Sequence, residues 1–290
     1  MDFGKRGLMG GSALQRGSLV RRTWRLLRRR GLRARLRVAC VERSWPEVPS
    51  NRRRRLAWED SPLQIDDLFE VSARWSTDPI DVLHALDITA PHSIGEEFRL
   101  LRVHLEARAA GAALQYPTRF QLGLRSQELL YSLVRSARPE VVVETGIADG
   151  WSTALILAAM DANGGGELHS VDIDTKSGAL VEAGHPRWHR HLTDGSAPQL
   201  ATVLSDLPRL DVFLHDSDHS YGVQAAEYRL ASGLLAPGGL LVSDDVNWSN
   251  AFLDHCRSLH RAPLVLADST KLMGIIRAGA EAATVEREPE

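Results

Sequence analysis

Short apolar segments alternate with helix-like segments over the C-terminal half of the chain. The candidate strands are residues 141–145, 167–174, 188–194, 211–216 and 239–245, and helical patterns at 152–160 and 221–235 lie between them. Such alternation is typical of βαβ units and predicts an α/β fold with a mostly parallel, doubly wound sheet. Residues 262–268 and 271–279 have almost no gap between them, so we expect an antiparallel hairpin at the sheet edge.

The charge of the chain is divided unevenly along its length. Residues 1–56 carry 17 Lys and Arg against three acidic residues, whereas residues 57–290 carry 18 basic residues against 34 acidic ones. The first segment is expected to be a basic arm, disordered or partly helical, that could bind nucleic acid or an anionic surface. The remaining boundaries place a helical cap at 57–138, the α/β domain at 139–279 and a frayed tail at 280–290.

Two helix starts are predicted inside the cap. Asp78 precedes Pro79 at the start of an apolar-periodic segment, an arrangement typical of an N-cap followed by the first helical turn. The spacing of Ser93 and Glu96 is that of a capping box.

Composition excludes several classes of protein. Apolar residues make up 43% of the chain and charged residues 25%, which is typical of a globular protein with a sizeable core and not of collagen or a disulfide framework. There is no apolar run of about 18 residues, so no transmembrane helix is expected. Cys40 and Cys256 lie far apart, which favours a reducing, cytoplasmic compartment. The Arg-rich start leaves a mitochondrial transit peptide as an alternative, and a homo-oligomer stays open.

Acidic residues stand at the ends of the candidate strands. In doubly wound sheets ligands bind at the carboxyl ends of the strands, so these residues predict a binding site: Glu144, Asp172, Asp194, Asp216, Asp244 and Asp245.

The loop after the first candidate strand reads ETGIADG, from Glu144 to Gly150. Its glycines allow a tight turn and a close approach of the backbone to a ligand. The spacing fits neither the GxGxxG dinucleotide motif nor a P-loop. An acid two positions before the first glycine suits a cationic or amino-bearing ligand.

Four segments together resemble the class I S-adenosylmethionine-dependent methyltransferases. ETGIADG is similar to their first motif, with Ala148 in place of the middle glycine, and VDID at 171–174 is similar to the second, whose acid binds ribose. Residues 193–196 resemble the third-strand loop, and LLAPGGLLVSDDV at 234–246 resembles the fifth-strand segment. The resemblance spans 121–279 and implies a Rossmann-like sheet of about seven strands with N-terminal helices. It also implies S-adenosylmethionine contacts from Glu144, Gly146, Gly150, Ser152, Asp172 (with Asp174 as its alternative), Asp194, Gly195 and Ser196.

Within that family, HDSDHSY at 215–221 followed by SDDV at 243–246 resembles the metal-dependent O-methyltransferases. These include the catechol type, the macrocin and mycinamicin sugar types and cephalosporin hydroxylase-like relatives. The resemblance implies magnesium held by Asp216, Asp244 and Asp245, with Asp216 and His219 as catalytic residues. An alternative is that the aspartates only cap helices. A histidine base predicts a rate that rises through roughly pH 6–7.

The function expected from these residues is metal-assisted O-methylation of a hydroxylated small molecule. One alternative is a nucleic-acid methyltransferase guided by the basic arm, and another is a non-catalytic relative with the same fold. A second histidine group, formed by His185, His189 and His191, has no acid or Cys partner in the sequence and is interpreted as a solvated patch.

Overall fold

The computed structural model describes residues 74–268 and 271–278. The basic arm, the first part of the predicted cap and the tail at 280–290 therefore lie outside the described residues, and the predictions made for them stay predictions.

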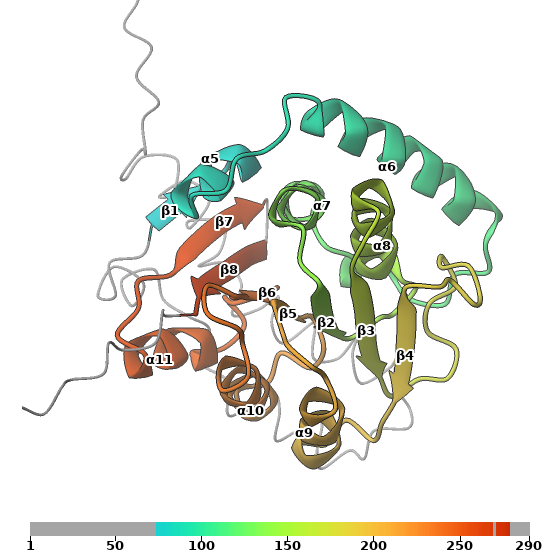
Figure 1. Ribbon diagram of the computed structural model, residues 1–290. Coiled ribbons are helices and arrows are strands. Elements are labelled where there is room, and N and C mark those ends of the chain that lie inside the picture. The colour runs from blue at the N-terminus through green and yellow to red at the C-terminus, as the bar shows by residue number, and fades with distance from the viewer. Residues whose placement is uncertain (1–73, 269–270, 279–290) are drawn as a thin grey trace, which may run out of the picture.

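In this part of the chain one sheet of eight strands forms the centre of the molecule (Figure 1). The strands are β1 (Arg74–Ser76), β2 (Val141–Thr145), β3 (Glu167–Asp172), β4 (Trp188–Leu192), β5 (Val212–His215), β6 (Leu240–Ser243), β7 (Leu264–Asp268) and β8 (Lys271–Arg277). Their order across the sheet is β1-β7-β8-β6-β5-β2-β3-β4. All neighbours are parallel except β8, which runs antiparallel to both β6 and β7.

This topology confirms the predicted α/β fold, with β2 to β8 in the predicted places and the antiparallel pair formed by β7 and β8. The expectation that residues 57–138 are helical is wrong at Arg74–Ser76. These three residues pair in parallel with Leu264 to Leu266 of β7. They form a strand because β7 pairs with β8 on one side only, and its other side is open to a partner. We expected β7 to be the edge strand of the sheet, and in the structure β1 takes that place.

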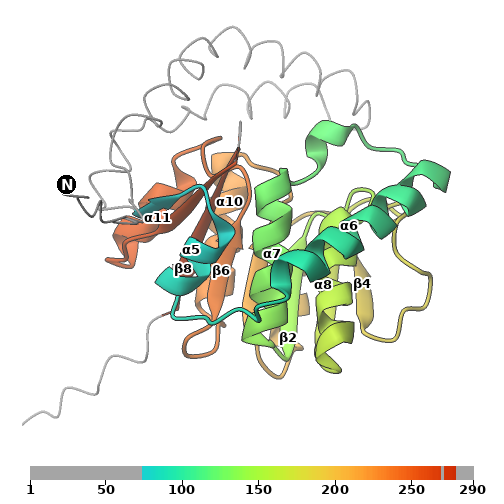
Figure 2. The ribbon, with the colours of Figure 1, turned by 90° about the horizontal axis from the view of Figure 1, so that it is seen from above.

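Helices cover both faces of the sheet. In chain order they are α5 (Pro79–Ala85), α6 (Ile94–Gly111), the 3-10 helix η1 (Thr118–Phe120), α7 (Leu124–Ala137), α8 (Trp151–Asn163), α9 (Ala197–Ser205), α10 (Tyr221–Ser232) and α11 (Ala251–Ser258). Figure 1 shows α5 to α8 on one side of the sheet and α9 to α11 on the other. From above, α6 crosses over α7 and α8 as an outer layer (Figure 2).

Two hydrophobic cores result from the alternation of side chains along the strands. Val142 of β2 faces the core shared with α7 and α8, where Leu129 and Ile156 are fully buried. The next residue, Val143, faces the opposite core, where Tyr228 of α10 and Phe252 of α11 are fully buried. Burial on both faces fixes the register of β2, since a shift by one residue would exchange its two faces.

The two predicted helix starts have different outcomes. Asp78 caps α5, because its side chain accepts a hydrogen bond from the Ile80 amide at 2.9 Å. The capping box at Ser93 is wrong: this residue has helical dihedrals and makes no side-chain cap bond. Its hydroxyl instead donates to the Glu97 carboxylate at 2.6 Å, since in that conformation the side chain meets the residue one turn ahead.

Over the described residues, no helix combines the length and the apolar character that a membrane span requires. Cys256 lies buried in α11 with a free thiol. The two faces of the sheet are thus occupied by core, and the strand ends remain as the place for chemistry.

Candidate active site

The carboxyl ends of β2, β5 and β6 lie side by side and present acidic residues. The Asp216 amide donates to Thr145 O at 2.9 Å, and the Asp244 amide donates to His215 O at 2.9 Å. These bonds continue the parallel ladders one residue beyond the strands, so that Asp216 and Asp244 leave the sheet as neighbours.

Two of the predicted acids contact one cation, and Asp216 lies beside them. Lys271 Nζ lies 2.7 Å from Asp244 Oδ2 and 3.3 Å from Asp245 Oδ2. Asp244 is fully buried, and the side chains of Asp216, Asp245 and Lys271 are 10%, 11% and 12% exposed. The structure therefore brings the predicted metal ligands together, and it adds a lysine that the sequence reasoning did not single out.

The acidic cluster holds more negative charge than Lys271 balances. Burial and the nearby Asp244 carboxylate raise the pKa of Asp216 well above its usual range. Burial, with Asp245 adjacent, raises the pKa of Asp244 to about 6. Burial lowers the pKa of Lys271, but Asp244 and Asp245 outweigh that effect and hold its pKa above the ordinary value. Lys271 thus stays protonated, and the cluster still favours additional positive charge.

His219 completes this group. Its Nε2 lies 3.8 Å from both Asp216 Oδ1 and Asp245 Oδ2. Its Nδ1 is buried and has no hydrogen-bond partner among the described residues. Burial lowers the pKa of His219 to about 3, although Asp245 opposes the shift. The imidazole is therefore neutral at pH 7, and the rise in rate through pH 6–7 that the sequence reasoning attached to it does not follow from its surroundings.

Glu144 ends β2 in a separate buried network. Its Oε1 accepts hydrogen bonds from Thr153 Oγ1 and Ser170 Oγ, both at 2.6 Å, and Trp188 Nε1 donates to the same Ser170 hydroxyl at 2.8 Å. Its Oε2 is buried without a partner among the described residues. Burial raises the pKa of Glu144 to about 7, against hydrogen bonds from Ser170, Thr153 and Ser152. A buried carboxyl with one bare oxygen is suited to a cationic ligand.

The glycines of the loop after β2 serve chain packing. Gly146 has φ +87°, and a Cβ there would lie 2.2 Å from the carbonyl oxygen of Asp216. Gly150 has φ +90°, and its Cβ would lie 3.1 Å from Gly178 Cα. Ala148 adopts φ +48° at the position of the middle glycine. The loop therefore lies directly against the backbone of neighbouring loops, and side chains at Gly146 are excluded by the fold itself.

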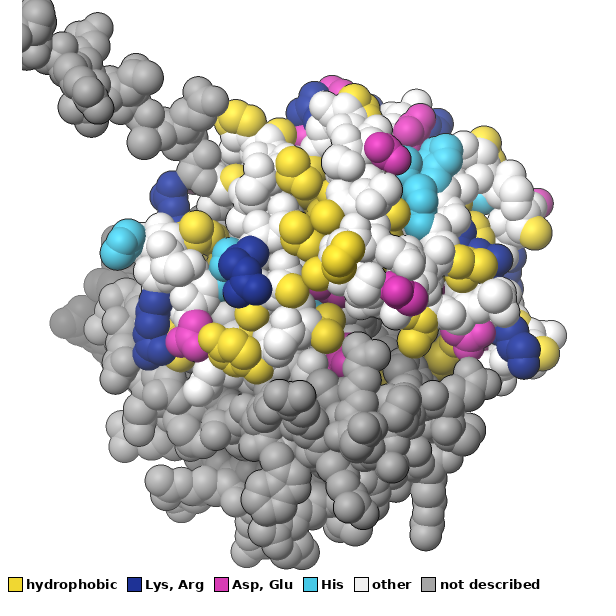
Figure 3. All heavy atoms as spheres, turned by 90° about the horizontal axis from the view of Figure 1, so that it is seen from below, with side chains coloured by type: hydrophobic (Ala, Val, Ile, Leu, Met, Phe, Trp, Pro, Cys, Tyr) yellow, Lys and Arg dark blue, Asp and Glu magenta, His cyan; other side chains and the backbone are white. Residues whose placement is uncertain are grey.

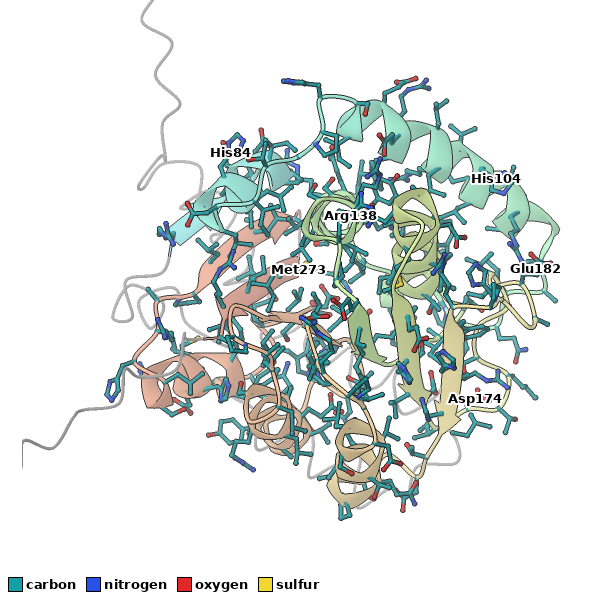
Figure 4. The ribbon with its side chains drawn as sticks, viewed as in Figure 1. His84, His104, Arg138, Asp174, Glu182 and Met273 are labelled. Carbon is teal, nitrogen blue, oxygen red and sulfur yellow. The ribbon has the colours of Figure 1, made fainter. Side chains whose placement is uncertain are left out.

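Asp172 supports the same loop from β3. Its Oδ2 accepts from the amides of Ile147 at 2.7 Å and Ala148 at 3.3 Å, and its Oδ1 accepts from the Asp174 amide at 2.9 Å. A carboxylate offers about four acceptor positions, so Asp172 keeps one for a ligand hydroxyl. Asp174, which follows the carboxyl end of β3 (Figure 4), accepts from the Tyr116 hydroxyl and from the Lys176 amide, so both acids already have partners and the alternative between them stays open.

The loop after β4 borders Asp172. The Thr193 amide donates to Asp172 O at 3.0 Å, and a Cβ on Gly195 would lie 3.1 Å from Ile173. Asp194 Oδ1 accepts from the Ser196 amide at 2.8 Å at the start of α9. Asp194 and Ser196 are thus engaged in shaping their own loop, next to the residue predicted to bind ribose. Their role toward a cofactor stays a prediction.

The donor sets fit the two groups implied by the resemblance. Ligand atoms of Asp216, His219 and Asp244 lie within 4.8 Å of one another, and Asp244 Oδ1 is buried without a partner among the described residues. Carboxylate oxygens that carry more negative charge than Lys271 balances suit a hard divalent cation. The group within this distance includes His219 and not Asp245, so the predicted set of three aspartates is met in part. Oε2 of Glu144 and the remaining acceptor position of Asp172 suit an amino group and a hydroxyl of a nucleoside-bearing cofactor.

Sequence reasoning missed Lys271, Glu227 and Asp149. The signal for Lys271 was present, because an antiparallel β8 must begin where β6 ends. Glu227 of α10 accepts from Thr145 Oγ1 at 2.6 Å and lies 2.7 Å from His215 Nδ1. Asp149 accepts the amides of residues 115 and 116. Neither acid stands at a strand end, so the pattern that found the others did not include them.

An open depression of about 420 Å³ lies at the opposite, amino-terminal ends of the strands. There Arg209 pairs with Glu140 at 3.0 Å and with Asp211 at 2.6 Å. Arg209 is thus paired with two acids on this side, and the acids predicted for the site lie at the opposite, carboxyl ends of the strands.

Comparisons with known proteins bear on the same segment. The family model described as "methyltransferase domain" matches residues 143–246. Among solved structures, the chain is similar to an O-methyltransferase from Bacillus cereus in complex with SAH, at 16% identity over 68% of this chain and 96% of that chain, with a TM-score of 0.46. It is similar to the O-methyltransferase TomG from Streptomyces achromogenes in complex with SAM, at 16% identity over 70% and 97%, with a TM-score of 0.45. The methyltransferase MycE of mycinamycin biosynthesis, in complex with Mg, SAH and mycinamycin VI, matches at 14% identity over 52% and 48%, with a TM-score of 0.40. No curated protein sequence matches the chain.

The buried Glu144 generates a prediction about stability. The pKa of its carboxyl rises from 4.5, the ordinary value that we take for the unfolded chain, to about 7 in the folded protein. Between these values the folded protein holds a proton that the unfolded chain has lost, so the free energy of unfolding falls as pH rises through this window. Gln cannot titrate. We expect Glu144→Gln to match the ligand-free wild type near pH 4.5 and to be more stable at pH 8, by on the order of 1–3 kcal/mol.

Urea unfolding at a series of pH values measures this difference. Asp206→Asn, at an exposed position, is the control and should parallel the wild type. If the wild type and Glu144→Gln change in parallel from pH 4.5 to 8, Glu144 does not carry the shifted pKa.

Proposed function

We propose that this chain, whose residues 143–246 match a family model described as a methyltransferase domain, is a class I S-adenosylmethionine-dependent methyltransferase that transfers the methyl group to an oxygen of a hydroxylated small molecule with the help of a divalent metal ion. The observation that carries the proposal is the group formed by Asp216, Asp244 and Asp245 around Lys271, with the neutral His219 beside it. Acids that exceed their counter-charge favour a cation, and a neutral imidazole accepts protons.

The cofactor supplies a methyl group already activated by its sulfonium. The role of the protein is to bind the polar groups of the cofactor. Glu144 offers the buried Oε2 to the positively charged amino group of the cofactor. That positive charge lowers the pKa of the carboxyl, so Glu144 ionises when the cofactor binds. Asp172 orders the loop backbone at Ile147 and Ala148 while it keeps an acceptor position for a ribose hydroxyl.

Magnesium, held by Asp216, Asp244 and Asp245, would lower the pKa of the acceptor hydroxyl and orient it. Lys271 contributes by keeping Asp244 and Asp245 ionised, since a fixed positive charge at 2.7 Å from Asp244 Oδ2 stabilises the carboxylate. Because Lys271 stays protonated, it acts as a counter-ion and not as a base.

His219 is the base of the proposal. Its Nε2 faces Asp216 and Asp245 at 3.8 Å, so a proton taken up at that atom enters a region of negative potential. The imidazole is neutral before the transfer, which leaves the nitrogen lone pair available. Because its low pKa makes it a weak base, it takes up the proton only in step with the methyl transfer, as negative charge is lost from the acceptor oxygen. The group contains two basic side chains, Lys271 and His219. Only His219 is neutral before the transfer and also has a nitrogen that faces the acids.

The first test is cofactor binding. We expect SAH to bind the wild type at micromolar affinity, about 7–8 kcal/mol, by titration calorimetry at pH 8. Glu144→Gln should weaken binding by about tenfold, because an amide cannot pair with the amino group as a carboxylate does. Asp206→Asn is the matched control and should bind as the wild type does. Unchanged affinity in Glu144→Gln would contradict the assigned contact, and no binding by the wild type would contradict the function.

Gly146→Val would be a poor probe of the cofactor site. Its side chain would collide with the Asp216 carbonyl, so the variant would lose the fold together with the cofactor. Isosteric changes at charged positions avoid this ambiguity.

The second test is metal dependence. Turnover, followed as SAH release over a panel of hydroxylated small molecules, should disappear in chelator and return with Mg²⁺. Asp244→Asn should raise the half-saturating Mg²⁺ concentration by about 10–100-fold, because a neutral amide replaces the fully buried carboxylate. Asp206→Asn should leave the metal requirement unchanged. Full turnover in excess chelator would show that these acids serve another purpose.

The third test concerns His219. We expect His219→Ala to keep SAH affinity and to lose about 10²–10⁴-fold in kcat, the usual scale for a general base. Since burial lowers the pKa of His219 to about 3, the wild-type rate should show no histidine titration between pH 6 and 7. His104→Ala, on the exposed surface of α6, is the control. A wild-type rate in His219→Ala would assign the base to another group.

A further inference from the structure

A second group of histidines lies on the opposite face of the sheet edge from Glu144. Glu167 and His169 come from β3, and His189 and His191 come from the edge strand β4. His169 is paired with His189 in the strand register, and His191 is two residues further along β4. The sequence reasoning grouped His185, His189 and His191 without an acid partner. In the structure His185 leaves this group and lies 3.0 Å from Asp161 Oδ2. The structure corrects this, because β3 supplies both a third imidazole and a carboxylate.

The ligand atoms of this group converge. Glu167 Oε2 lies 3.8 Å from His169 Nε2 and 3.7 Å from His189 Nε2. Two ligands that each lie about 2.0–2.1 Å from a tetrahedral zinc ion are about 3.4 Å apart. Only a small adjustment of side chains therefore separates the observed arrangement from a coordination shell. Glu167 and His189 side chains are 59% and 42% exposed, so an ion has access from solvent.

His191 is placed to orient one of the ligands. Its Nε2 lies 3.0 Å from Nδ1 of His169. When Nε2 of His169 binds a metal ion, Nδ1 carries the proton and donates to His191, which fixes the tautomer that ligation requires. The rings of His169 and His189 are stacked with centroids 4.6 Å apart, and those of His169 and His191 are 5.3 Å apart. Strand pairing holds all three imidazoles in place before any ion arrives.

We propose that Glu167, His169 and His189 bind a late first-row divalent metal ion such as Zn²⁺, with His191 as the positioning residue for His169. Two imidazoles and one carboxylate form a donor set that suits zinc, nickel or copper better than magnesium. Burial lowers the pKa of His169 to about 4, so its ring is neutral and ready to coordinate at pH 7. Figure 3 shows histidine side chains gathered on the described surface with acidic side chains beside them.

The site differs from the acidic group at the strand ends in position and in purpose. It joins β3 to β4, and β4 is the last strand of the sheet on this side. An ion bound here ties down an edge strand, which is otherwise held by backbone bonds along one side alone. Asp172 is the last residue of β3, and β4 leads into the loop that carries Asp194. Metal binding thus stiffens the strands that lead to these residues.

The experiment measures the Zn²⁺ affinity of the full chain by competition with a chromogenic chelator. Excess Mg²⁺ is present so that Mg²⁺, and not Zn²⁺, binds at Asp216, Asp244 and Asp245. We expect the double variant His169→Ala/His189→Ala to lose at least about 10²-fold in affinity and Glu167→Gln to lose about tenfold. His104→Ala, an exposed histidine of α6 (Figure 4), should bind as the wild type does. Zn²⁺ should also raise the melting temperature of the wild type and not that of the double variant.

The melting temperature without metal shows whether each variant folds. If the double variant does not fold, His189→Ala alone, at the more exposed position, replaces it. Wild-type Zn²⁺ affinity in the folded histidine variants overturns the proposal. Loss of Zn²⁺ binding in Asp244→Asn with retention in the double variant also overturns it, since the ion then occupies the strand-end group.

Discussion

The structure depends on carboxylates that leave the sheet at buried strand ends with too little positive charge around them. Ionised groups are expensive to remove from water unless they are paired. Here the parallel ladders fix the backbone at Asp216 and Asp244, so the side chains cannot move apart to relieve their repulsion. Lys271 reduces the repulsion between the carboxylates. The remaining repulsion, together with burial, raises the pKa of Asp244. In the proposed function a divalent ion supplies the positive charge that Lys271 leaves missing.

The loop around Gly146 is the second constraint, and it joins the proposed cofactor contacts to the acids at the ends of β5 and β6. A carbonyl oxygen of residue 216 occupies the space that a side chain at 146 would need, while the Asp172 carboxylate accepts the amides of the next two residues. The loop is thus positioned by the ends of β3 and β5 simultaneously. A shift in either strand end would be felt at both the cofactor contacts and the acids.

Much of the fold could be predicted from the sequence because its strands are buried on both faces and its acids stand at their ends. Short apolar runs such as Val141 to Thr145, which alternate with helical patterns, predict strands of a parallel sheet. What could not be predicted depends on contacts between distant residues. β1 is a strand only because β7 offers it an edge, and Ser93 loses its cap because Glu97 is the better partner in the conformation it adopts. The histidine group at β3 and β4 looked incomplete because its acid, Glu167, is 22 residues away from His189 in the chain and becomes adjacent only through parallel pairing.

The place of Lys271 in the chain has a consequence for biosynthesis. A nascent chain leaves the ribosome from its N-terminal end at about 5–20 residues per second, so β2, β5 and β6 emerge before β8. Until the last strand inserts between β6 and β7, the aspartates at the ends of β5 and β6 have no lysine beside them. Closure of the sheet and neutralisation of its most costly charges are therefore one late event.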